Sequence, residues 1–297
     1  MLTTMRIAHC NGFLRRVATV CRRWQPHRCG GTCYFAAVQP TTSSVETYMT
    51  TALQRIHEAV PLAKAAGILA EGRYSALPVV NDHGAIVGVI SRSDIVHARV
   101  GDGRHALALP DTTVAHVMSQ GPLVVSPAAT MLDAARSMTE LGVHRLFVVD
   151  HGKLVGVLST LDVARALEQT RSPAPLRPFV TPVIKAVADT TPVQEAVAVL
   201  DAAGVSSLVV VDGDWPVGTF GQLDALLARN GAANQPVSEV MERAIVCMPP
   251  DTKLWHAASQ VVAMDVRRII VCERGQTVGI TSTLDLARAF VTLGTGA

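Results

Sequence analysis

Four copies of one short motif limit what this 297-residue chain can fold into. In each copy a glycine is followed six positions later by an aspartate, and successive aspartates are 61 to 68 residues apart. That period is long enough for a small domain and too long for one solenoid unit. Upstream landmarks recur in the same register at Met49, Met118, Val180 and Met241. The four copies are GVISRSD (Gly88–Asp94), GVLSTLD (Gly156–Asp162), GTFGQLD (Gly218–Asp224) and GITSTLD (Gly279–Asp285).

The hydrophobic periodicity changes in the same order within every repeat. An amphipathic helix is predicted first, because apolar residues recur at helical spacing. A β-branched run then predicts a strand, a turn leads to a second strand that contains the glycine, and the aspartate opens a second helix. Each repeat is therefore expected to be helix, strand, strand, helix. A unit this small cannot bury its own sheet and is expected to pack against a neighbour.

These repeats resemble the CBS domain, a module of roughly sixty residues, over about residues 45–292 of the chain. The resemblance implies an α/β (α+β) fold in which four CBS repeats pair into two Bateman modules. It also implies clefts that bind adenine nucleotides or related adenosyl ligands. The expected segments are 1–44 (basic and disordered), 45–100, 110–168, 176–230 and 236–292 (repeats one to four).

A serine stands three residues before the aspartate in three repeats, at the predicted junction from strand to helix. A hydroxyl there lies beside backbone N–H groups at the positive end of a helix dipole, which suits a phosphate. The aspartate one turn later has the geometry to accept hydrogen bonds from ribose hydroxyls. The alternative is that serine and aspartate only cap the helix. The candidate binding residues are Ser91, Asp94, Ser159, Asp162, Asp224, Ser282 and Asp285, with Gly221 replacing serine in the third repeat.

Basic pairs alternate with small pairs just before the first long strand of each repeat. The second and fourth repeats carry His144–Arg145 and Arg267–Arg268, whereas the first and third carry Ser75–Ala76 and Ser206–Ser207. This alternation indicates a duplicated two-repeat module. GVHRLFVVD resembles the gamma subunit of AMP-activated protein kinase and its prokaryotic relatives, which implies that these pairs face nucleotide phosphates. Arginine offers a planar fork to phosphate oxygens, and histidine makes such a contact pH-dependent. The alternative is that they are solvent-facing charges on an edge strand.

No enzyme motif is present, because the chain lacks a P-loop, G-x-G-x-x-G, G-x-S-x-G and H-E-x-x-H. The leading hypothesis is a regulatory sensor of AMP, ADP or ATP that controls an unidentified enzyme, kinase or transporter by rearranging its modules. The alternatives are a ligand-free scaffold and a regulator that binds S-adenosylmethionine. A homodimer is possible in either case. We expect no metal cofactor, no nucleic-acid partner and no membrane span.

The N-terminus differs from the repeats in charge. Residues 1–45 contain six arginines and no acidic residue. Such a segment is typical of a disordered basic tail or of an organellar transit peptide. The expected location is cytoplasmic, and it is an organelle if the segment is a transit peptide. Four cysteines lie there without the spacing of a zinc knuckle. Among the linkers, residues 168–178 are the richest in proline and are expected to be the hinge between the modules.

Overall fold

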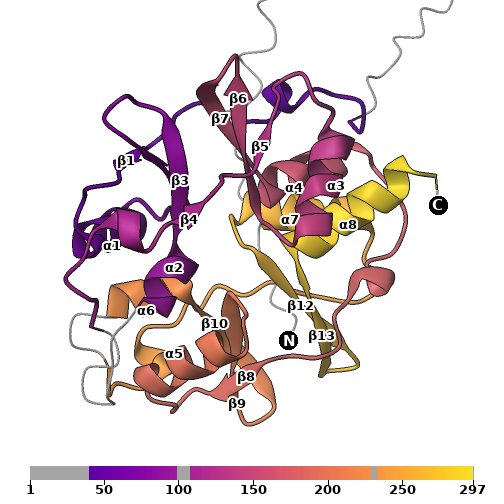
Figure 1. The fold of residues 1–297 in the computed structure, drawn as a ribbon. Coiled ribbons are helices and arrows are strands. Elements are labelled where there is room, and N and C mark those ends of the chain that lie inside the picture. The colour runs from indigo at the N-terminus through magenta and orange to yellow at the C-terminus, as the bar shows by residue number, and fades with distance from the viewer. Residues whose placement is uncertain (1–39, 99–107, 229–232, 297) are drawn as a thin grey trace, which may run out of the picture. The chain divides into compact units, whose positions relative to one another are not determined.

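The same order of elements recurs in all four repeats. The computed structural model describes residues 40–98, 108–228 and 233–296, which belong to one compact unit, Val38–Ala297 (Figure 1). The predicted order of helix, strand, strand, helix is confirmed, and a 3-10 helix and a short strand precede it in each repeat. Strands of two or three residues show no period in a sequence, so they were not predicted. The α-helices are α1 (Leu62–Glu71), α2 (Arg92–His97), α3 (Met131–Leu141), α4 (Thr160–Gln169), α5 (Val193–Ala202), α6 (Gln222–Ala228), α7 (Leu254–Ala263) and α8 (Thr283–Gly294).

Each repeat forms its own small sheet from one parallel and one antiparallel strand pair. The parallel pair flanks the first helix, and the antiparallel pair is a hairpin. β-branched residues form the central strand, and one valine at the same position in each repeat is fully buried. The sheets are β1 (Ile56–His57), β2 (Ala76–Val80), β3 (Ile86–Ser91) and β4 (Ser119–Gln120); β5 (Val124–Val125), β6 (Arg145–Asp150) and β7 (Lys153–Ser159); β8 (Ala186–Ala188), β9 (Ser207–Asp212) and β10 (Trp215–Gly221); and β11 (Cys247–Met248), β12 (Arg268–Glu273) and β13 (Gln276–Ser282).

Adjacent repeats exchange their leading segments. β4, from the start of the second repeat, pairs with β3 of the first, and Thr50 pairs in return with Val157 of β7. The third and fourth repeats do the same through Thr181 with Ile280 and Glu242 with Thr219. The predicted pairing of the repeats into two modules, first with second and third with fourth, is therefore confirmed.

The repeated glycine is needed for this exchange. A Cβ atom built at Gly88 would lie 2.7 Å from the Met118 sulfur, and one at Gly156 would lie 2.6 Å from the Met49 sulfur. A Cβ atom at Gly218 would lie 2.6 Å from the Met241 sulfur, and one at Gly279 would lie 2.4 Å from Val180 Cγ1. Glycine and upstream landmark are thus contact partners across a repeat pair, which explains why both recur with the same period.

A second set of backbone bonds links each pair through the first helix of each repeat. The N–H of Leu62, the first residue of α1, donates to the Thr112 carbonyl of the partner repeat (2.8 Å), and Val114 N–H donates back to Val60 (2.9 Å). The partner segment thereby accepts from one of the helix N–H groups that have no intrahelical acceptor. The equivalent bonds at the other first helices are Met131 to Ser43, Val193 to Gln235 and Leu254 to Ala174.

Helices join the two modules in a different combination. α4 packs against α7 and α8, and α3 packs against α8, so the second repeat meets the fourth (Figure 1). α2 and α1 pack against α6, so the first repeat meets the third. The buried side chains divide accordingly into two cores, one shared by repeats two and four and one by repeats one and three. Each repeat therefore contacts one neighbour through strands and another through helices.

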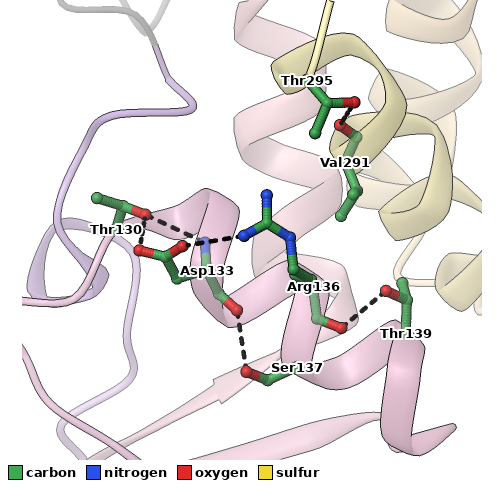
Figure 2. Close-up of polar contacts among 7 residues, drawn as sticks. All are labelled: Thr130, Asp133, Arg136, Ser137, Thr139, Val291 and Thr295. Carbon is green, nitrogen blue, oxygen red and sulfur yellow. Dashed lines mark hydrogen bonds and ion pairs between the residues drawn. The ribbon is translucent and has the colours of Figure 1, made fainter. Parts of the chain in front are cut away.

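Local hydrogen bonds define the helix ends. At the start of α3 the Thr130 hydroxyl donates to the Asp133 carboxylate (2.7 Å) and accepts from the Asp133 N–H (3.1 Å), as Figure 2 shows. Arg136, one turn later, points toward the same carboxylate at 3.6 Å. Along α3 and α8, Ser137, Thr139 and Thr295 donate to backbone carbonyls. These contacts keep polar side chains on the helices without a break in the helical ladder.

Two expectations about segments outside the repeats are corrected. Residues 41–44 were assigned to the disordered N-terminal segment, but Thr41 and Ser43 accept hydrogen bonds from the first residues of α3. Residues 1–39 lie outside the described part of the chain. The expected hinge at 168–178 is anchored to the fourth repeat, because Leu176 is fully buried and its N–H donates to Thr252 (2.8 Å).

The side chain of Arg177 strengthens that anchor. Its guanidinium donates to Asp251 (3.0 Å) and to Glu273 (2.8 Å).

In the described residues we find neither a helix long and apolar enough to cross a membrane nor a group of three His, Cys, Asp or Glu side chains placed to hold a metal ion.

Candidate nucleotide-binding site

Strand register brings the two sequence motifs together within each repeat. The first residue of the central strand lies opposite the last residue of the hairpin, so Arg145 faces Ser159 and Arg268 faces Ser282. In the first and third repeats the same register pairs Ala76 with Ser91 and Ser207 with Gly221. Residues about 14 positions apart in sequence thus become direct cross-strand neighbours.

The serine and aspartate of each motif bind each other. Asp94 accepts from the Ser91 N–H (2.7 Å) and hydroxyl (2.6 Å), and the Asp94 N–H donates to the Ser91 hydroxyl (3.2 Å). The same capping box forms at Ser159–Asp162 and Ser282–Asp285. At the third repeat only the Gly221 N–H takes the serine's place, at 2.7 Å from Asp224. The helix-capping interpretation therefore describes the contacts in this structure.

The four aspartates differ in their surroundings. Asp162 and Asp285 are 3% and 8% exposed, and each forms an ion pair with an arginine one turn later, Arg165 or Arg288. Asp94 is more exposed and accepts from the Ser119 hydroxyl of the partner repeat (3.3 Å). The sequence offered a signal for this difference, since only the second and fourth repeats have arginine at that position.

Asp224 is the unusual carboxylate. Burial raises its pKa to about 6, the Gly221 N–H opposes that rise, and the nearby Glu242 adds to it. Arg92 of the first repeat also lowers this pKa, which places its guanidinium near Asp224. A carboxyl group with this pKa takes up a proton in mildly acidic solution.

The basic pairs converge with one further arginine into a half-buried basic cluster. Burial lowers the pKa of Arg145 to about 9, and the charges of Arg267 and Arg92 lower it further. Burial also lowers the pKa of Arg268 to about 10, again with Arg267 beside it. Arg145 and Arg268 are half-buried and begin β6 and β12, the central strands of their sheets, which contradicts the edge-strand alternative. The basic cluster consists of Arg92, His144, Arg145, Arg267 and Arg268.

His144 is neutral within this cluster at pH 7. Burial lowers its pKa to about 4, and Arg268, Arg145 and Arg267 lower it in the same direction. Asp285 acts in the opposite direction. A dianion placed beside the ring would favour its protonation, because an adjacent negative charge stabilises imidazolium.

Arg92 was not identified from the sequence. It is the first residue of α2, at the position held by Thr160, Gln222 and Thr283 in the other repeats. Its N–H donates to the Ser75 carbonyl (3.0 Å), while its buried Nε atom has no hydrogen-bond partner among the described residues. The signal available in the sequence was this single charged residue at an otherwise uncharged position.

A cavity of about 230 Å³ opens beside the cluster, where the first three repeats meet. Its wall includes His144, Ser206, and the ion-paired His97 and Asp201. Ser206 also accepts from Arg268, so the cavity and the cluster share a wall. The volume is below the 300–1,000 Å³ typical of pockets for small molecules. The cavity therefore suits part of a nucleotide better than a whole one.

Comparison with known proteins agrees with this architecture. The CBS domain family matches residues 45–101, 114–169, 176–231 and 237–292. Protein MJ1225 from Methanocaldococcus jannaschii has a similar fold: the TM-score is 0.74 at 19% identity, covering 84% of this chain and all of that one. At that identity the likeness concerns the fold alone.

Sequence relatives match shorter stretches. The pig 5'-AMP-activated protein kinase subunit gamma-3 is 34% identical over 117 residues, 37% of this chain and 22% of that protein. YhcV from Bacillus subtilis, a CBS domain-containing protein, is 30% identical over 122 residues, 41% of this chain and 84% of YhcV. One relative bears an enzyme name, homoserine O-acetyltransferase from Methanococcoides burtonii, matched over 25% of its length. The chain thus spans about a quarter of several of these relatives. With four matched segments covering most of its length, it belongs to the CBS domain family.

Proposed function

We propose that this protein is a regulatory sensor that binds AMP, ADP or ATP between paired CBS repeats, with the phosphates in the basic cluster. The observation that carries the proposal is the cluster itself. Like charges held together away from water are unfavourable, so Arg145, Arg267 and Arg268 favour an anion between them. The pKa values of Arg145 and Arg268, lowered to about 9 and about 10, express that cost.

The ribose end of the ligand falls to the aspartates. In the second and fourth repeats the register places the arginine and the serine as neighbours, so phosphate and ribose contacts lie within one nucleotide's length. Asp94 and Asp224 are partly exposed. At Asp162 and Asp285 a ribose must compete with Arg165 and Arg288. The name of the kinase relatives, activated by 5'-AMP, supports an adenine nucleotide as the ligand.

Regulation follows from where the cluster lies. His144 and Arg145 come from the first module, and Arg267 and Arg268 from the second. An anion bound among these side chains contacts both modules and stabilises one arrangement of the modules. A partner protein then binds that arrangement in preference to the other. The regulated partner is an enzyme, kinase or transporter of the cell.

One observation favours the ligand-free scaffold as a second candidate. The serine and aspartate groups already bind each other, so the folded protein does not need a ligand to satisfy them. S-adenosylmethionine is less well matched, because its sulfonium cation would be repelled by the cluster.

Calorimetry on the full chain tests the proposal with adenosine, AMP, ADP, ATP, NAD and S-adenosylmethionine. The double variant Arg145→Gln/Arg268→Gln should weaken ADP and ATP about tenfold or more and leave adenosine within about twofold, since a charge-assisted contact contributes about 1.5–3 kcal/mol. Arg136→Gln is the matched control, because Arg136 is a half-buried arginine on α3 outside the basic cluster, and it should change neither. If no adenosyl compound binds, the scaffold is supported instead.

A further inference from the structure

The first repeat lacks a basic pair, yet it supplies a charge to the basic cluster. Its residues at the basic-pair position are Ser75 and Ala76. Arg92 leaves the end of the same hairpin, and its backbone N–H is bonded to the Ser75 carbonyl (3.0 Å). From there its guanidinium comes near Arg145, Arg267 and Asp224, which belong to the second, fourth and third repeats.

Unsatisfied polar atoms gather around this position. The Arg92 Nε and the hydroxyls of Ser75 and Ser207 are buried without a hydrogen-bond partner among the described residues. Buried donors without acceptors are costly and uncommon in folded proteins. Ser75 is the first residue of the small pair in the first repeat, and Ser207 is the second residue of the small pair in the third repeat, so unpaired hydroxyls come from both modules.

The charge balance indicates what acceptor is missing. Four guanidinium groups, Arg92, Arg145, Arg267 and Arg268, meet with neutral His144. Of the acids that act on them, Asp162 and Asp285 are already paired with Arg165 and Arg288. Asp224 acts on Arg92, but with a pKa of about 6 it is half protonated at pH 6. One phosphate monoester carries about two negative charges and leaves part of the cluster uncompensated.

We propose that Arg92 is the residue through which the first repeat binds phosphate, and that the basic cluster selects ligands with a chain of two or more phosphates. This rests on the proposed function for the adenosine part of the ligand, but the polyphosphate contact stands by itself. The chemical class is a linear polyphosphate group, free or carried by a nucleoside.

The test uses the full chain and isothermal titration with orthophosphate, pyrophosphate, tripolyphosphate, adenosine, AMP and ATP. Arg92→Thr introduces the residue found at this position in the second and fourth repeats, so the helix start is preserved. The control is Arg73→Gln, because Arg73 also acts on the charge of Arg92 but is 68% exposed. Thermal unfolding of each variant verifies the fold.

We expect Arg92→Thr to weaken tripolyphosphate and ATP about tenfold or more, AMP less, and adenosine by no more than about twofold. Arg73→Gln should leave all of them within about twofold. Unchanged tripolyphosphate and ATP affinities in a folded Arg92→Thr protein would overturn the inference, and so would equal losses for adenosine and ATP. Wild-type binding of tripolyphosphate without adenosine or AMP would support the inference and contradict the nucleotide function. Wild-type binding of adenosine and AMP, with no binding of pyrophosphate or tripolyphosphate, would support the nucleotide function and contradict the inference.

Discussion

The contact between glycine and its partner's side chain gives a prediction that depends on geometry alone. At Gly156 a new Cβ would lie 2.6 Å from the Met49 sulfur and 3.3 Å from the Thr50 carbonyl oxygen. At Gly279 it would lie 2.4 Å from Val180 Cγ1 and 2.7 Å from the Thr181 carbonyl oxygen. The first obstacle is a flexible thioether, which moves by rotamer changes, whereas the second includes backbone that is hydrogen-bonded to Ile280.

The alanine variants should therefore differ. Replacing a strand glycine by alanine gains about 0.5–1 kcal/mol through backbone entropy, and overpacking costs about 1–3 kcal/mol or more. We expect Gly156→Ala to lose at most about 1 kcal/mol and Gly279→Ala to lose about 3 kcal/mol. At about 2–4 °C per kcal/mol for a unit of this size, thermal unfolding resolves the two.

Truncating the partner side chain separates the two obstacles. Met49→Ala should relieve Gly156→Ala, so that the double variant is more stable than the sum of the single changes predicts. Val180→Ala should relieve Gly279→Ala only in part, because the Thr181 carbonyl oxygen remains 2.7 Å away. Equal losses at the two glycines, or equal rescue by the two truncations, would refute the reasoning.

Three further changes probe the cluster and the linker. Burial raises the pKa of Asp224 to about 6, so the folded state binds this proton more tightly than the unfolded state does. The stability that the proton contributes is lost as pH rises from about 4 through 6. In urea unfolding, Asp224→Asn should raise the free energy of unfolding relative to the wild type by on the order of 2–3 kcal/mol more at pH 7.5 than at pH 4.5. The pKa of His144 is lowered to about 4, so the stability that its neutral ring contributes is present above about pH 6.5 and is lost as pH falls toward 4. His144→Gln should therefore make unfolding less sensitive to acid over this range. A variant that loses stability in acid as the wild type does would contradict this prediction. Leu176→Ala should lower the free energy of unfolding by about 2–5 kcal/mol, because the side chain is fully buried. Pro173→Ala is the control, since Pro173 is exposed in the same linker. If neither change lowers stability, the segment is a flexible linker after all.

Periodicity made much of the fold predictable. The spacing of Gly156 and Asp162 and their copies, with the β-branched runs before them, located both long strands and both helices of each repeat. It also placed Arg145 and Ser159 in one site, because a hairpin makes its two ends neighbours. These features follow from local pattern, which a single sequence carries in full.

What the sequence left open depends on contacts between repeats. Met49 and Gly156 were both recognised as landmarks, but their contact arises only when strands are exchanged. Arg92 reaches the basic cluster because three other repeats surround it, and Leu176 is fixed by the fourth repeat. Proline content predicted a hinge at residues 168–178, but burial of Leu176 anchors this segment to the fourth repeat.

The two kinds of interface explain how one ligand could act on the whole unit. Strands tie the first repeat to the second and the third to the fourth, whereas helices tie the first to the third and the second to the fourth. The buried Thr160 and Thr283 hydroxyls, 2.8 Å apart, lie at the contact between the second and fourth repeats. The Gln222 amide donates to the Ser93 hydroxyl (2.7 Å) at the contact between the first and third repeats. All four residues lie in the strand-to-helix motifs, one or two positions after the serine or glycine that begins each Ser/Gly-x-x-Asp segment. A group bound at those motifs would therefore lie next to the helix contacts between modules, within two residues of the interface.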